Sequence, residues 1–115
     1  MPHVIIEYAQ PVAKNKSLDS MLLAIHQAVI DSGLFDENNI KTRLIPVTTY
    51  RIGNGKDTYL SVQLRIHSGR NEAQKKALSH AVLEAIRQQA WPVSVVTVEV
   101  VDMDRSSYAK YTMYD

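Results

Sequence analysis

The chain has 115 residues, enough for one domain that buries roughly two-thirds of its unfolded surface in a single core. Its 13 basic and 12 acidic residues give a net charge of +1, so no global field recruits nucleic acid or a membrane surface. The absence of cysteine excludes disulfides, a thiolate nucleophile and cysteine metal ligands.

The start of the chain bears on where the protein resides. It lacks a charged leader region, and no apolar run approaches the roughly 18 residues that a membrane span requires. We therefore expect a cytoplasmic, soluble protein.

The first two expected elements are a strand and a helix. Residues 2–8 are mostly apolar and β-branched, which is typical of a buried strand. Apolar residues then recur at helical spacing, with Ser17 placed to cap the first turn and Gly33 to end the last. The pattern predicts a helix over residues 18–32.

Two further strands are expected in the middle of the chain. Residues 40–49 have the composition of a strand, but Pro46 has no backbone N–H to donate, which predicts an edge strand or a bulge. A turn signal follows at residues 53–55. Apolar and polar side chains then alternate over residues 59–67, which predicts a strand with one buried face.

A second helix and a last strand complete the pattern. Leu78 and Val82 belong to an apolar helical stripe that starts near Asn71, and Pro92 marks the break after it. Residues 93–101 are dense in valine, which predicts a strand.

The two halves of the chain also resemble each other. Ala24-Ile25 followed by Ala28-Val29 matches Ala81-Val82 followed by Ala85-Ile86, 57 residues further on. One β-α-β unit cannot cover both faces of its sheet, whereas two units can share one sheet. The sequence therefore predicts an α/β (α+β) fold made of a duplicated β-α-β unit, a four-stranded sheet backed by two helices. We expect one domain over residues 1–115, with pseudo-repeats over about 2–50 and 58–104.

Pro2 directly follows the initiator methionine, so removal of Met1 by an aminopeptidase leaves a free prolyl nitrogen. A free α-amino group titrates at roughly 7.7–8.0, and burial beside cations lowers that pKa further. A base poised near neutral pH suits proton shuttling. The alternative is an ordinary proline at the start of a strand, whose nitrogen stays an amide while Met1 is retained.

The segment from Gly69 to Lys75 has the pattern Gly-Arg-x-x-x-Gln-Lys and resembles a segment of 4-oxalocrotonate tautomerase. With the opening Met-Pro-His, the paired units and the length, residues 1–108 are similar to the tautomerase superfamily. They are most similar to its long members, the 5-carboxymethyl-2-hydroxymuconate isomerases. The resemblance implies a homotrimer without a cofactor, in which an amino-terminal proline moves a proton on an unsaturated keto or enol diacid during aromatic breakdown.

The resemblance also implies roles for individual residues. Pro2 matches the catalytic proline, and Arg70 matches a substrate-binding arginine at a strand-to-helix junction. Lys41 and Arg43 fall on the family's Ile-Arg-x-Arg pattern, but lysine replaces the first arginine and lacks its bidentate fork. Either of them could therefore fill the second cationic role. Tyr108 lies where relatives carry an aromatic residue near the site.

Elementary chemistry favours cations at such a site independently of family. Removing a proton next to a carbonyl builds an enolate, whose charge needs fixed donors, and guanidinium matches the geometry of a carboxylate. Arg70 stands near the expected start of a helix, a place that favours anions. The alternative for Arg70, Lys41 and Arg43 is an ordinary solvated side chain.

Other kinds of site lack their signatures. The four histidines show no ligand spacing, so no metal site is expected. The glycine turn at residues 53–55 lacks the spacing of a phosphate loop, and no Gly-x-Ser-x-Gly elbow is present. The tail tyrosines Tyr108, Tyr111 and Tyr114 should find surfaces to pack on.

The sequence thus predicts an isomerase or tautomerase acting on a small carboxylate or dicarboxylate, with Pro2 as its acid and base. Two alternatives remain open, since fold does not fix function. One is a non-catalytic trimer that binds a small molecule. The other is a related proline-dependent enzyme of the hydratase or dehalogenase type.

Overall fold

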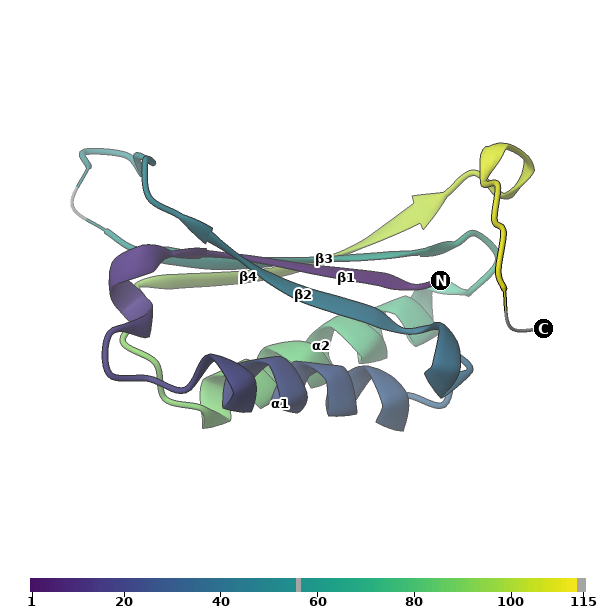
Figure 1. The fold of residues 1–115 in the computed structure, drawn as a ribbon, viewed down its shortest axis with the longest axis horizontal. Coiled ribbons are helices and arrows are strands. Elements are labelled where there is room, and N and C mark those ends of the chain that lie inside the picture. Colours follow the sequence, from purple (N-terminus) through teal and green to yellow (C-terminus); the bar gives the residue numbers. More distant parts are fainter. Residues whose placement is uncertain (56, 114–115) are drawn as a thin grey trace.

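The computed structural model describes residues 1–55 and 57–113 and contains two β-α-β units in succession (Figure 1). The six main elements are β1 (His3–Ala9), α1 (Leu18–Asp31), β2 (Lys41–Val47), β3 (Tyr59–His67), α2 (Glu72–Gln88) and β4 (Val95–Met103). Short 3₁₀ helices lie at Gln10–Ala13, Glu37–Asn39 and Arg105–Ser107. The predicted order of elements is confirmed.

The four strands form one sheet in the order β2-β1-β3-β4. Within each unit the two strands are parallel, and the units join through the antiparallel pair of β1 and β3. Both helices cover the same face of the sheet, and no element of the described chain covers the other face (Figure 1). β2 is an edge strand, so Pro46 needs no partner on its outer side, as predicted.

The strand register brings distant parts of the chain to one end of the sheet. His3 at the start of β1 pairs with Lys41 at the start of β2 and with Arg65 near the end of β3. His67 at the end of β3 pairs in turn with Met103 at the end of β4. The N-terminus therefore lies at the same end of the sheet as the segment that follows β4 (Figure 1).

The core between the sheet and the helices is apolar throughout. Every second residue of β3 is fully or almost fully buried, as its alternating pattern predicted, and the helices contribute one buried stripe each: Met21, Ile25 and Val29 from α1, and Leu78, Val82 and Ile86 from α2. No polar or charged residue among the described ones is buried. Any chemistry therefore lies at the margins of the sheet rather than inside this core.

The helix ends follow from local hydrogen bonding. The Ser17 hydroxyl accepts from the Ser20 amide at 3.1 Å, and Gly33, with φ of +71°, takes the left-handed conformation just after α1. At α2 the Asn71 side chain and Gln74 form a reciprocal capping box. Neither helix, nor any other in the described residues, has the length and hydropathy that a bilayer crossing demands.

The last strand begins and ends two residues later than the sequence predicts. The Val93 amide donates within a turn to the Trp91 carbonyl at 2.9 Å, and the Val95 amide donates to the carbonyl of Thr58, the residue just before β3. Pairing then continues to Met103, whose carbonyl accepts from the Ser68 amide. Valine content marks the strand but not the point at which its ladder starts.

Candidate active site

A cavity of about 370 Å³ opens at the end of the sheet beside the N-terminus. Its lining comes from the start of the chain, the turn before β2, the end of β3 and the segment after β4: Met1, Asn39, His67, Arg105, Tyr108 and Lys110. Two of these side chains are cationic and none is a carboxylate. The cavity therefore favours an anion.

Asn39 brings three amino groups together at this cavity. Its backbone carbonyl accepts from the Met1 amino group and from Lys41 Nζ, each at 3.0 Å. Its side-chain oxygen accepts from Lys110 Nζ at 3.4 Å. An amide carries no net charge, and none of the ion pairs within the described residues includes these groups. Like charges thus gather here without a carboxylate partner among those residues.

The amino terminus responds to this environment with a lowered pKa. The pKa of the Met1 amino group is lowered from 8.0 to about 5, mainly by burial and further by the hydrogen bond and charge of Lys41 and the charge of Lys110. At neutral pH the amine is therefore mostly uncharged and holds a free lone pair. The unfolded chain takes this proton near pH 8.0, so the folded state loses stability as the pH falls from 8.0 to about 5.

Tyr108 is held between two histidines on the cavity wall. Its hydroxyl lies 3.0 Å from His3 Nε2, and the His67 ring meets it edge to face at 5.0 Å between centroids. Desolvation lowers the pKa of both histidines, and the charges of Lys41 near His3 and Arg105 near His67 lower it further. His67 Nδ1 is buried and has no hydrogen-bond partner in the described part of the chain.

Three of the five predicted site residues meet at this end of the sheet. Pro2 is buried next to the cavity, and its carbonyl accepts from the Lys41 amide at 3.1 Å. Lys41 belongs to the group of cations around Asn39, and Tyr108 lines the cavity itself. The first two strands and the tail thus deliver Pro2, Lys41 and Tyr108 to one place.

The other two predicted residues do not line this cavity. Arg70 donates to the Leu34 carbonyl at 2.7 Å, and its guanidinium lies over the Phe35 ring, 5.0 Å from the centroid. Arg43 is exposed on β2, two residues beyond Lys41. Both still act on the site through their charge, since Arg43 contributes to the lowered pKa of His3 and Arg70 to that of His67.

The sequence analysis did not single out Asn39, Arg105 or Lys110 as site residues. The signal that could have found them is topological rather than local. β4 runs parallel to β3, and β3 runs antiparallel to β1, so the segment after β4 has to return to the chain start. Tyr108 packs there, whereas Tyr111 is 90% exposed and Tyr114 lies outside the described residues.

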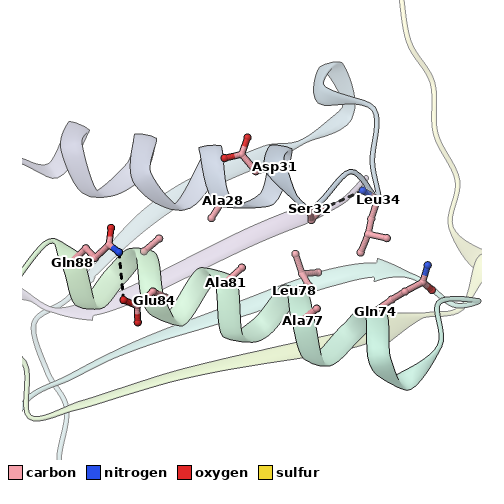
Figure 2. Close-up of a pocket in the computed structure, with 11 residues that line it drawn as sticks. Ala28, Asp31, Ser32, Leu34, Gln74, Ala77, Leu78, Ala81, Glu84 and Gln88 are labelled. Atoms are coloured by element: carbon pink, nitrogen blue, oxygen red, sulfur yellow. Dashed lines mark hydrogen bonds between the residues drawn. The ribbon is translucent and has the colours of Figure 1, made fainter.

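A larger hollow of about 570 Å³ lies between α1 and α2, and Figure 2 shows Ala28, Ala77 and Ala81 along it. Its charged lining residues are Asp31 and Glu84, which would repel an anion. None of its lining residues is a cation, and its Glu84 carboxylate has a pKa lowered by the hydrogen bond from Arg87. In the described residues, no three acidic, histidine or cysteine side chains are placed to hold a metal ion.

Comparisons with known proteins bear on this arrangement. A family model described as 5-carboxymethyl-2-hydroxymuconate isomerase matches residues 2–105. A 5-carboxymethyl-2-hydroxymuconate Delta-isomerase of Escherichia coli is 25% identical over 89 residues, which are 76% of this chain and 71% of that protein.

Two solved structures show the same fold at lower identity. One is a 5-carboxymethyl-2-hydroxymuconate isomerase from Deinococcus radiodurans R1, with a TM-score of 0.85 and 17% identity over 96% of this chain and 89% of that one. The other is a fused 4-OT protein described as a symmetric trimer, with a TM-score of 0.78 and 19% identity over 96% of this chain and 93% of that one.

The lowered pKa of the amino terminus gives a first prediction. In protein that retains Met1, the amino group should titrate near pH 5, measured as the pH dependence of its acylation by mass spectrometry. In Lys41→Met the pKa should rise without reaching 8.0, because burial is the larger cause and remains. Lys14→Met, far from the cavity, serves as the control. A titration near pH 8 in the parent protein would contradict the burial of this amine.

Proposed function

Because this chain is an isomerase of the 5-carboxymethyl-2-hydroxymuconate isomerase family, within the tautomerase superfamily, we propose that it moves a proton on an unsaturated, carboxylated keto or enol acid similar to 5-carboxymethyl-2-hydroxymuconate. The reaction needs no cofactor in this proposal. The observation that carries it is the amino terminus, which lies in a cation-lined cavity with its pKa lowered to about 5.

Pro2 is the proposed acid and base. Removal of Met1 moves the free amine one residue along the chain, to a proline that is itself buried and fixed to Lys41 through its carbonyl. The prolyl nitrogen takes a proton from the substrate, which leaves a dienolate, and returns that proton to a different carbon. Cations around the nitrogen keep its pKa low, so it is uncharged and ready to accept a proton at neutral pH.

Cationic side chains are proposed to stabilise the charge that develops on the substrate. Lys41 stands beside the amino terminus and is therefore placed to donate to the enolate oxygen. Arg70 and Arg43 are proposed to bind carboxylate as well, although neither lines the cavity of its own chain. Arg43 is exposed on an edge strand, where it could reach a neighbouring subunit. Tyr108 forms the aromatic wall.

A homotrimer is the proposed assembly. Within residues 1–55 and 57–113 of a single chain, one face of the sheet carries no covering element, and both edge strands are open. Ile45 and Val95, one on each edge strand, are 38% and 45% exposed. Apolar side chains on open strands are normally covered by a partner. The fold similarity to a fused 4-OT protein described as a symmetric trimer supports the same number of subunits.

The proline mechanism predicts that activity depends on removal of Met1. Protein whose N-terminus is verified by intact mass should isomerise hydroxymuconate-type enols in an ultraviolet assay. Protein that retains Met1 should be slower by about 10²–10⁴-fold, the usual contribution of a positioned base. Processed Pro2→Ala should lose less, because it keeps a primary amine.

Far-ultraviolet circular dichroism of the same preparations provides the control for folding. Equal rates with and without Met1 would exclude proline catalysis. A folded protein that binds diacids but isomerises none of these enols would favour the non-catalytic trimer instead.

If the protein is a trimer, sedimentation equilibrium at micromolar concentration should give the mass of three 13.0 kDa chains. Ile45→Asp places a charge at a half-covered apolar position of the edge strand and should dissociate the assembly. Leu83→Asp, at a 40% exposed apolar position of α2 on the helix layer, is the matched control and should leave it intact. A monomeric parent protein, or a trimer unaffected by Ile45→Asp, would contradict this arrangement of subunits.

A further inference from the structure

The segment after β4 carries two cations over the N-terminus. Arg105 and Lys110 both line the cavity, one on each side of Tyr108 in the sequence. Tyr108 is anchored by its contact with His3 at 3.0 Å, so the segment is held in place rather than left in solvent. The neighbouring acid does not neutralise Arg105, because the Asp104 carboxylate accepts from the Ser106 hydroxyl at 2.9 Å and does not line the cavity.

Lys110 shares Asn39 as a hydrogen-bond acceptor with the other two amino groups. Its ammonium group lies 3.4 Å from the Asn39 side-chain oxygen, while the carbonyl of the same residue holds Lys41 and the amino terminus. Lys110 and Lys41 thus present like charges to one neutral residue, and like charges repel. Charges are held together in this way at sites that bind the opposite charge. An anionic ligand in the cavity would be attracted by both ammonium groups and would offset the repulsion between them.

We propose that Arg105 and Lys110 form a subsite for one carboxylate of a diacid substrate. The inference rests on the proposed function, since the reacting carbons must lie beside the prolyl nitrogen while this carboxylate is held by the tail. A guanidinium binds a carboxylate through two parallel hydrogen bonds, and the lysine adds a compact point charge. The cavity of about 370 Å³ falls in the size range of small-molecule sites.

Arg70 does not fill this position in its own chain. Its guanidinium is committed to the Leu34 carbonyl and the Phe35 ring, and it does not line the cavity. Of the charges that lower the pKa of His67, that of Arg105 has the largest effect, larger than that of Arg70, which agrees with its closer approach to the cavity wall. The tail cations are therefore what distinguishes a diacid from a monoacid in this cavity.

The test compares two enol substrates on processed protein, the diacid 2-hydroxymuconate and the monoacid phenylenolpyruvate. In Arg105→Gln and Lys110→Gln, the KM for the diacid should rise by about tenfold or more, the usual value of a hydrogen bond to a charged group. In Arg105→Gln the kcat for the diacid, and both constants for the monoacid, should change little, because only the second carboxylate loses its partner. Lys110→Gln also removes a charge that lowers the pKa of the terminal amine, so its constants are compared on the high-pH plateau, where the amine is uncharged with or without Lys110. Lys76→Gln, exposed on α2, is the matched control.

A second measurement does not depend on turnover. Isothermal titration with adipate, an unreactive diacid, and with hexanoate, its monoacid counterpart, reports the subsite directly. Weaker adipate binding in both variants with unchanged hexanoate binding supports the subsite, even if no enol is isomerised and the proposed function fails. An unaltered preference for diacids, an equal loss for both ligand classes, or no binding of adipate to the parent protein overturns the subsite, whether or not the isomerase activity stands.

Discussion

The antiparallel pairing of β1 with β3 is the constraint on which the candidate site depends. It sets His3 against Arg65, so the first residues of the chain lie where β3 ends. Because β2 is parallel to β1 and β4 is parallel to β3, the start of β2 and the end of β4 lie at this same end of the sheet. Four segments far apart in the sequence therefore meet at one end of one sheet. A different strand order would leave the amino terminus in solvent, with a pKa close to that of an ordinary amine.

The separation of core and charges explains how this end of the sheet can hold so many cations. All buried residues in the described part of the chain are apolar, so the fold does not depend on the polar groups at its margin. Those groups are free to take an arrangement that opposes protonation of the amine, at some cost to stability below pH 8. Sites that bind charge commonly carry such unfavourable local electrostatics.

The elements could be predicted because their signals are local. Alternation marked β3, and the capping residues Ser17 and Asn71 marked the helix starts. The site was only partly predictable. Pro2 was marked by its place directly behind Met1 and Lys41 by a resemblance to a known family, whereas Lys110 has no local signal. It acquires its position from the course of the chain after β4, which depends on the tertiary pairing of strands rather than on neighbouring residues.

The proposal that the Pro2 nitrogen is the acid and base is tested most directly by identifying which nitrogen of the processed protein reacts with an electrophilic substrate analogue. An acetylenic 2-oxo acid offers an alkyne carbon to a nearby uncharged amine, and peptide mass spectrometry locates the adduct. One label per chain is expected, on the Pro2 nitrogen, with activity lost in proportion and with the labelling rate titrating at or below the ordinary amino value of about 8. Labelling of lysine or histidine with Pro2 untouched, or full activity after Pro2 is completely labelled, would contradict it.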